Sequence, residues 1–142
     1  MRIAIGSDHA GFPLKEGLRK RLVETGHSVE DLGCYNTERV DYPIVAQELA
    51  RKVSGGEFER GVLVCGSGIG VSIAANRIAG ARAALCSEPL SAHLSREHND
   101  ANILCLGARL IGEDMALVIL AAFLETPFSG GRHQQRVALL DD

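Results

Sequence analysis

The sequence predicts an α/β fold, a single domain on a doubly wound, five-stranded parallel sheet of the Rossmann-like kind. Short apolar runs of β type alternate five times with segments of helical periodicity. This alternation favours parallel strands joined by right-handed crossover helices on both faces of the sheet. The chain has 142 residues, of which 46% are hydrophobic, and it carries no internal repeat or low-complexity linker. We therefore expect residues 1–142 to form one domain with the flavodoxin-type strand order 2-1-3-4-5.

Five apolar or β-branched runs are the expected strands, over residues 2–6, 27–32, 61–65, 82–86 and 103–106. The first two helices follow from apolar residues at a helical spacing, which are Leu14, Leu18 and Leu22 and then Val45, Leu49 and Val53. Pro13 and Pro43 suit the first turns of these two helices. Three more helices are expected over residues 68–77, 89–98 and 113–124. The C-terminal tail, residues 126–142, is expected to be helical and to contact the site or a partner subunit.

Two loops of this fold carry reactive groups. In the expected order, strands one and three are neighbours where the sheet reverses direction, and ligands bind outside their carboxyl ends. Residues 7–11 follow the first strand and residues 65–70 follow the third. The Asp8–His9 pair, a thiol and glycine-rich backbone in one crevice predict acid/base chemistry on a small, anionic, oxygen-rich ligand. Alternatively, Asp8 and His9 form only a turn that caps the first helix.

Cys65 stands where the third strand ends and the glycine-rich residues 66–70 begin. Backbone N–H groups at such a junction, together with the N-terminus of the next helix, favour anions. The same field would stabilise the thiolate of Cys65 as a base or nucleophile. A cysteine that ends a parallel strand is by itself more often a small core residue, but the adjoining glycines favour the catalytic interpretation. The other cysteines lack such neighbours and are expected to be inert: Cys34, Cys86 and Cys105.

Charge and cysteine spacing limit the possible partners and the compartment. The formal net charge is −3, with basic and acidic residues spread along the chain, so we expect no nucleic-acid partner. The sequence opens directly with a strand and has no apolar run of about 20 residues, so neither a signal peptide nor a membrane segment is expected. The four cysteines form no Cys-x-x-Cys pair, which favours reduced thiols and a cytoplasmic location.

Motif spacing excludes three common nucleotide sites. No lysine follows the glycines of residues 66–70, so a P-loop is excluded. The first strand-to-helix turn lacks the G-x-G-x-x-G pattern and no acidic residue follows the second strand to hold a ribose, which argues against a dinucleotide. With no Trp, two Tyr and four Phe, the chain also offers few aromatic walls for a flavin.

A second polar group lies late in the chain. If the tail is helical, Arg132 and Arg136 are four residues apart and present two guanidinium groups on one face for a phosphate, although a solvated helix face is the alternative. His98 follows the fourth helix, so it lies at the opposite edge of the sheet from Cys65 and outside the cleft of its own subunit. We therefore expect a homodimer in which His98 and Asn99 complete the partner's active site.

Six blocks of the sequence together resemble the type B ribose-5-phosphate isomerases. They are residues 6–11 (GSDHAG), 39–43 (RVDYP), 65–70 (CGSGIG), 74–77 (AANR), 95–102 (SREHNDAN) and 130–136 (GGRHQQR). The blocks are specific in this order and spacing, and the resemblance covers nearly the whole chain. The resemblance implies a Rossmann-like, usually dimeric enzyme that uses neither a metal nor an organic cofactor. The family also includes allose-6-phosphate and galactose-6-phosphate isomerases.

The resemblance also implies residue roles. Cys65 matches the thiolate that moves a proton between C2 and C1 of the open-chain sugar through a cis-enediolate, whereas the base of the glutamate branch would fall at Val71. His98 resembles the acid that opens the sugar ring. Ser67 and the backbone N–H groups of the loop would stabilise the enediolate, by roughly 3–4 kcal/mol per good donor. The implied substrate contacts are Asp8, His9, Gly66, Gly68, Ile69, Gly70, Asn99, Arg109, Arg132 and Arg136.

The sequence thus indicates an aldose-ketose isomerase of carbohydrate metabolism that interconverts ribose 5-phosphate and ribulose 5-phosphate. One alternative is the same chemistry on a hexose 6-phosphate such as allose 6-phosphate. A second alternative is a sugar-phosphate binding protein without activity. A pure binder needs neither the thiolate of Cys65 nor the proton donor His98, so the enzyme is favoured over the binding protein.

Overall fold

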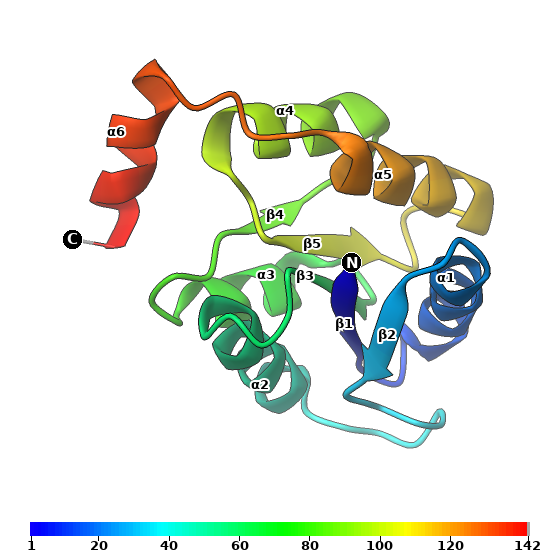
Figure 1. Ribbon diagram of the computed structural model, residues 1–142. Coiled ribbons are helices and arrows are strands. Elements are labelled where there is room, and N and C mark those ends of the chain that lie inside the picture. The colour runs from blue at the N-terminus through cyan, green and yellow to red at the C-terminus, as the bar shows by residue number, and fades with distance from the viewer. Residues whose placement is uncertain (142) are drawn as a thin grey trace.

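The computed structural model describes residues 1–141. Its parallel strands are β1 (Arg2–Ser7), β2 (Ser28–Asp31), β3 (Arg60–Cys65), β4 (Ala83–Leu85) and β5 (Ile103–Gly107). Its helices are α1 (Phe12–Glu24), α2 (Tyr42–Ser54), α3 (Ile69–Asn76), α4 (Pro89–Asn99), α5 (Glu113–Glu125) and α6 (Arg132–Ala138), followed by a 3-10 turn (Leu139–Asp141) (Figure 1). The predicted α/β fold with five parallel strands is confirmed. No helix within residues 1–141 has the length and apolar character needed to span a bilayer.

The order of the strands differs from the prediction at one end of the sheet. It is β2-β1-β3-β5-β4, so the expected order 2-1-3-4-5 is wrong for the last two strands. All five residues of β5 are buried, whereas β4 has three residues and none of them is fully buried. A strand that is apolar on both faces belongs inside a parallel sheet, and a short strand suits the edge. Consequently β5 pairs with β3, with Cys65 opposite Gly107.

Side chains of the inner strands alternate between two apolar layers. One layer packs Ile3, Ile5, Val62, Val64, Leu104 and Leu106 against α1, α4 and α5. The other packs Ala4, Leu63, Cys65, Ile103 and Cys105 against α2 and α3. This period of two residues follows from the pleat of a strand. It puts the side chain of Cys65 on the face of the sheet that α2 and α3 cover.

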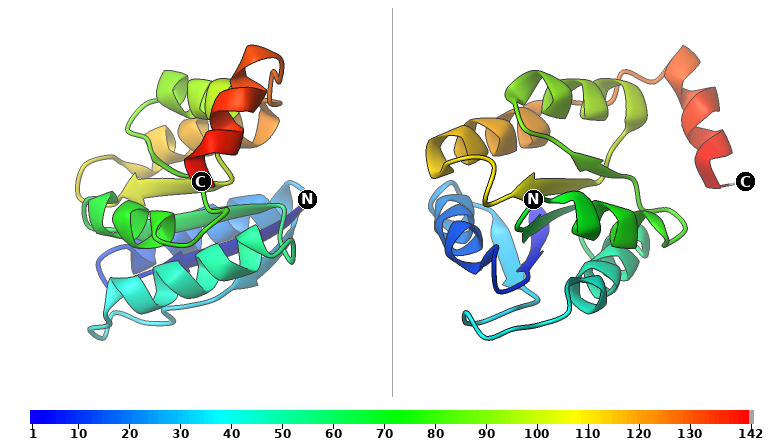
Figure 2. Two further views of the ribbon diagram at one scale, coloured as in Figure 1. Left: turned by 90° about the vertical axis from the view of Figure 1, so that its left-hand side faces the viewer. Right: turned by 180° about the vertical axis from the view of Figure 1, so that it is seen from behind.

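The C-terminal helix α6 stands away from the body of the molecule (Figures 1 and 2). The connection from α5 runs along α4, where the Ser129 N–H donates to the Glu97 carbonyl at 3.1 Å. The rings of His98 on α4 and His133 on α6 then stack with centroids 4.4 Å apart. The tail is helical over residues 132–138 and continues as the 3-10 turn, whereas residues 126–130 of the expected helical tail are an extended connection. The helix rests on the end of α4, far from the carboxyl edge of the sheet.

Candidate active site

A cavity of about 610 Å³ opens at the carboxyl end of the sheet. Its walls come from the loops after β1, β3 and β5 and from the first turns of α2 and α3. Its lining residues are Asp8, His9, Ala10, Tyr42, Cys65, Gly66, Ser67, Ile69, Gly70, Ile73, Arg109 and Leu110. The two loops that the sequence placed opposite each other therefore meet in one cavity. A cavity of this size suits a small metabolite.

Cys65 lies at the inner wall of this cavity, with 5% of its surface exposed. The Gly68 N–H donates to its sulfur at 3.1 Å. Gly68 adopts a left-handed conformation, with φ of 77°, and no side chain caps α3. Of the first N–H groups of α3, that of Gly68 donates to the sulfur and that of Ile69 donates to the Ser67 hydroxyl oxygen at 3.2 Å. The positive end of the helix therefore stabilises negative charge at the sulfur and in the cavity.

Glycine is required in this loop because the backbones approach closely. A Cβ on Gly68 would lie 2.5 Å from the Leu85 side chain and 2.8 Å from the backbone of Leu106, and a Cβ on Gly107 would lie 2.5 Å from the Ser67 carbonyl oxygen. The loop after β3 therefore packs directly on the end of β5. Gly68 shapes this loop but does not line the cavity.

Arg109 reaches the cavity because β5 is next to β3. Its backbone N–H donates to the Gly66 carbonyl at 2.9 Å, and the Ala108 N–H donates to the Cys65 carbonyl at the same distance. These bonds continue the β3–β5 ladder past the ends of the strands. The guanidinium group of Arg109 lies over Gly66, 3.4 Å from where a Cβ on that glycine would stand. The Arg109 side chain is exposed and lines the cavity that also holds the thiol, so it brings a positive charge to the mouth of that cavity.

Asp8 and His9 face the same cavity from the loop after β1. The Asp8 carboxylate accepts the Gly11 N–H at 2.9 Å, which is the turn-forming role considered as the alternative from sequence. Asp8 is buried and still lines the cavity, so the two roles are compatible. His9 Nδ1 accepts the Val40 N–H at 3.3 Å, which makes Nδ1 an acceptor and leaves the other ring nitrogen to carry the proton when the ring is neutral.

The remaining cysteines differ from Cys65 in their surroundings. Burial raises the pKa of Cys86 to about 11, and burial also raises the pKa of Cys105 well above its usual range. Cys34 is buried beside Ser7, with the two side-chain heteroatoms 3.8 Å apart. None of these three sulfurs lines the cavity. Their environment agrees with the inert role expected from sequence.

The late polar residues form a separate group. His98, Asn99 and Arg136 line a second hollow of about 240 Å³ with residues of α6, and they share no lining residue with the Cys65 cavity. Arg132 lies one turn from Arg136 on the same helix. His98 thus stays outside the cleft of its own chain, as predicted, but the expected reason is wrong: His98 lies in the last turn of α4, which leads into β5, and β5 is the neighbour of β3 rather than the far edge strand. The structure brings the candidate residues together as two groups rather than one.

Sequence reasoning did not select four residues that line the cavity: Ala10, Tyr42, Ile73 and Leu110. Tyr42 has the clearest role, because a Cβ on Gly70 would lie 2.6 Å from its ring. The phenol therefore packs on the first turn of α3. Its signal was its place before Pro43, at the start of a helix that leaves the same edge of the sheet. A further hollow of about 520 Å³ adjoins this tyrosine and is also lined by Asp8, His9 and residues 39–41.

A doubly wound sheet with a thiol, a helix N-terminus, an imidazole and a guanidinium group around one cavity defines an α/β protein for small anionic ligands, equipped for proton transfer. The sequence matches the family model described as Ribose/Galactose Isomerase over residues 3–140. The chain belongs to this family and is an isomerase.

Individual relatives agree with this assignment. The chain is 52% identical over 136 residues to ribose-5-phosphate isomerase B of Escherichia coli K12, which covers 96% of this chain and 91% of the relative. It is 41% identical over 138 residues to a D-erythrulose-4-phosphate isomerase of Pectobacterium atrosepticum, and this match covers 96% of this chain and 91% of the relative. A crystal structure of a ribose 5-phosphate isomerase from Thermotoga maritima matches with a TM-score of 0.96 at 51% identity, covering 99% of this chain and 97% of the other.

Proposed function

We propose that this isomerase interconverts ribose 5-phosphate and ribulose 5-phosphate, with Cys65 as the base. The observation that carries the proposal is the sulfur of Cys65, which faces the cavity and accepts a hydrogen bond from the Gly68 N–H. A thiolate held by backbone N–H groups can remove the proton from C2 of the open-chain aldose and return it to C1. The aldose and the ketose differ in the positions of two hydrogens, one that moves from C2 to C1 through the thiol and one that moves from O2 to O1, so the reaction needs no oxidant.

The enediolate intermediate carries negative charge on the oxygens of C1 and C2. The N–H groups of residues 66–70 and the Ser67 hydroxyl are the donors that we assign to these oxygens; those of Gly68 and Ile69 also donate to the Cys65 sulfur and the Ser67 hydroxyl oxygen and would be shared with the intermediate. Donors of this kind lower the barrier only when they are already in place, and the close packing of Gly68 on β5 keeps them there. The Ile69 N–H lies 3.2 Å from the Ser67 hydroxyl oxygen, which fixes that side chain. Ile69 and Gly70 form the floor against which the sugar lies.

We assign the remaining groups around the cavity to the sugar and its phosphate. Asp8 and His9 would bind sugar hydroxyls, and Arg109 would bind the phosphate, because a guanidinium group matches the geometry of phosphate oxygens. All three line the cavity that holds Cys65.

We further propose a homodimer in which each site is completed by the other subunit. His98 would open the furanose ring, Asn99 would bind the sugar, and Arg132 and Arg136 would bind the phosphate. Support comes from the separation within one chain, since His98 and Arg136 line a hollow apart from the Cys65 cavity. Large apolar side chains are also exposed near that cavity, including Ile69 at 50% and Ile73 at 54%. A partner subunit would cover such side chains.

Two related substrates are the alternatives. A hexose 6-phosphate such as allose 6-phosphate would use the same proton transfer, and the name of the relative from Pectobacterium points to a four-carbon sugar phosphate for that protein. The adjoining hollow beside Tyr42 leaves space for a longer sugar. A sugar-phosphate binding protein without activity is disfavoured because the cavity presents the Cys65 thiol to its ligand.

We place the enzyme in the reducing cytoplasm and in pentose phosphate metabolism, in keeping with its free cysteines.

The test measures turnover of the purified protein on ribose 5-phosphate, allose 6-phosphate and erythrulose 4-phosphate. The proposal expects the highest kcat/KM on ribose 5-phosphate. It also expects that Cys65→Ala abolishes turnover while binding of ribose 5-phosphate in a calorimeter persists, whereas the control variant Cys86→Ala stays active. Iodoacetamide should inactivate the enzyme, and substrate should protect it. Undiminished turnover by Cys65→Ala would reject the mechanism, and a clear preference for another sugar would reject the substrate.

A further inference from the structure

Lys15 is fully buried, although it carries a charged amine. It lies near the start of α1, one turn after the loop that holds Asp8 and His9. Lysine is almost never buried completely unless its ammonium group has partners, because removing the charge from water is costly. Lys15 lines neither the Cys65 cavity nor the hollow beside it. The partners of its ammonium group must therefore be groups of the protein itself.

Most partners of Lys15 lie at the end of β2 and in the turn that follows it, while on α1 the Glu16 carboxylate lies 3.6 Å and the Phe12 ring 5.0 Å from the lysine Nζ. Its Nζ donates to an Asp31 carboxylate oxygen at 2.7 Å and also to the Cys34 carbonyl oxygen. The ring of Tyr35 lies 5.6 Å from the same nitrogen. The other Asp31 oxygen accepts the Gly33 N–H at 2.9 Å. One buried ammonium group and one carboxylate thus fix the turn at residues 33–35.

This turn is hydrogen-bonded to the end of β1, the strand that leads into the loop with Asp8 and His9. The Ser7 N–H donates to the Gly33 carbonyl at 2.6 Å, and the Cys34 N–H donates to the Ser7 carbonyl at 2.8 Å. Ser7 directly precedes Asp8 and His9 in the sequence. The turn therefore extends the edge of the sheet beyond β1 and holds the backbone from which the site loop departs.

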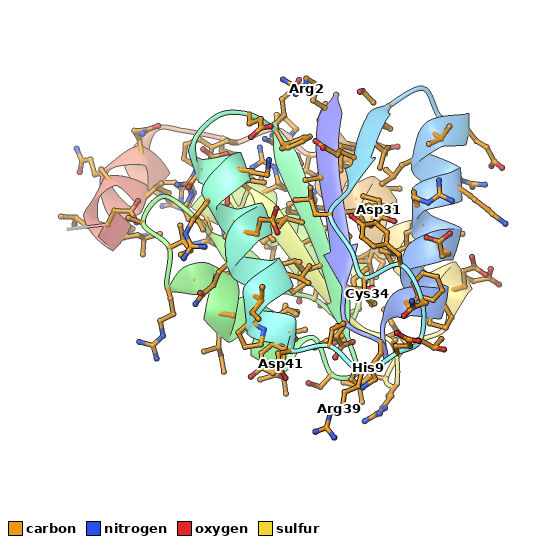
Figure 3. The ribbon with its side chains drawn as sticks, turned by 90° about the horizontal axis from the view of Figure 1, so that it is seen from below. Arg2, His9, Asp31, Cys34, Arg39 and Asp41 are labelled. Carbon is orange, nitrogen blue, oxygen red and sulfur yellow. The ribbon has the colours of Figure 1, made fainter. Side chains whose placement is uncertain are left out.

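The same segment returns to the site further along the chain. After the turn it runs to Val40, whose N–H donates to His9 Nδ1 at 3.3 Å. Arg39 and Asp41 then line the hollow next to the Cys65 cavity. Figure 3 shows Asp31, Cys34, Arg39 and Asp41 along this one segment, which passes His9 on its way to α2. We call residues 32–41 the rim segment. It is fixed at one end by Lys15 and contacts His9 at the other.

We propose that Lys15 is a positioning residue for the isomerase site: through Asp31 and the Cys34 carbonyl it holds the rim segment, and the rim segment holds His9 and the entrance of the cavity. The inference rests on the proposed function, because it assumes that His9 binds the sugar phosphate. Lys15 touches neither Cys65 nor the loop after β3. Its loss should therefore disturb substrate binding and leave the thiol as it is.

Replacing Lys15 by Met keeps the length and volume of the side chain and removes the ammonium group. The Asp31 carboxylate and the Cys34 carbonyl then lose their common donor, and the rim segment is no longer fixed to α1. A displacement of a binding group by about 1 Å can lower activity by roughly 100-fold. We expect kcat/KM of Lys15→Met to fall by roughly 10- to 100-fold, mainly through a higher KM.

The experiment compares Lys15→Met with Lys20→Met, because Lys20 is an exposed lysine on the same helix. For each variant, KM, kcat and the melting temperature are measured, and the alkylation rate of Cys65 by iodoacetamide is followed by mass spectrometry. The proposal expects a raised KM with an unchanged alkylation rate for Lys15→Met, and wild-type values for Lys20→Met. A kcat/KM within about twofold of wild type would overturn it. So would a rise of the alkylation rate in parallel with KM, since that indicates general loosening.

Asp31→Asn provides a second variant in case Lys15→Met does not fold. Asp31 is partly exposed, with 19% of its side chain accessible, and its amide replacement leaves one oxygen for two donors, Lys15 Nζ and the Gly33 N–H, so one of the two bonds that fix the turn is lost. The same readouts and the same two overturning results apply to it. Failure of the proposed function would be seen separately, because the wild-type protein would then lack ribose 5-phosphate isomerase activity whatever the variants do.

Discussion

The Cys65 cavity and the His98 hollow differ in how they are built. The cavity is built largely from backbone: its loop is bonded to β5, Gly68 in that loop has no space for a side chain, and its thiol accepts a hydrogen bond from the loop itself. The hollow is made of side chains that project from two helices, and ring stacking of His98 on His133 joins them. The shape of the cavity is therefore fixed by backbone packing, whereas the shape of the hollow depends on how α6 packs on α4.

This difference suits the two tasks proposed for the regions. Stabilising an enediolate needs donors that do not move during the reaction, which a packed backbone loop supplies. Opening a ring and binding a phosphate need side chains that reach the sugar and its phosphate. In this proposal a partner subunit supplies them. Variants of both regions can test whether they form one site, and then how much each region contributes to binding and to stability.

The largest effect is expected when each of the two regions is inactivated by a substitution and the two variants are then combined in one dimer. Cys65→Ala and His98→Ala should each lower kcat by roughly 100- to 10,000-fold, the range for loss of a general acid or base. When the two inactive variants are mixed so that subunits exchange, about a quarter of the wild-type activity should return, because half of the dimers then carry one complete site. Activity is followed as ribulose 5-phosphate formed.

The control is each variant mixed with itself, which should remain inactive. Heterodimers are quantified by native mass spectrometry with one variant isotopically labelled. If heterodimers form and no activity returns, the shared site is wrong, and His98 serves another purpose.

The next effect concerns the phosphate. Arg136→Gln should raise KM for ribose 5-phosphate by roughly 10- to 100-fold, since a hydrogen bond to a charged group contributes about 1.5–3 kcal/mol. Steady-state kinetics measure the change, and Arg51→Gln on the exposed end of α2 serves as the matched control. An unchanged KM with a lowered kcat would assign Arg136 to the reaction rather than to binding.

A smaller effect on stability tests the rigid loop. Gly68→Ala should lower the free energy of unfolding by at least about 1–2 kcal/mol, because alanine is disfavoured at a left-handed φ and its Cβ would meet the backbone of β5. Gly56→Ala is the control, since Gly56 also has a positive φ, of 84°, but a Cβ there meets nothing within 4 Å, so the difference between the two variants reports the contact with β5. Thermal denaturation measures both. Equal melting temperatures would show that the loop tolerates displacement.

The smallest effect tests the histidine stack. Slight desolvation, with His98, Arg132 and Arg136 nearby, lowers the pKa of His133 from its usual 6.5, while Glu97 opposes the shift. The folded state therefore binds a proton less readily than the unfolded chain, so any stabilisation is complete above pH 6.5 and is lost as the pH falls below it. Hydrogen exchange of the α6 amides, corrected for intrinsic rates, should accelerate from about pH 7.5 to about pH 5.5. His133→Gln should remove this dependence, and an equal acceleration in that variant would contradict it.

Much of the fold and of the site followed from local patterns. The five strands, the crossover helices and the helical tail were predictable because apolar periodicity and the proline positions report local backbone geometry directly. Cys65 with its glycines, and Asp8 with His9, were predictable because they follow strands whose carboxyl ends meet in any sheet of this class. Tyr42 was missed because its role arises from contact with Gly70, which lies far away in the sequence.

The sequence by itself determined the alternation of strands and helices, the chemistry offered at the ends of β1 and β3, and the distance of His98 from that chemistry. Only the tertiary structure decided that β5, rather than β4, lies beside β3. The physical reason is competition for the buried position: both strands could pair with β3, and the longer, wholly buried β5 takes the place where both faces are covered. That choice brings Arg109 to the cavity that holds the thiol and packs the glycine loop against Gly107.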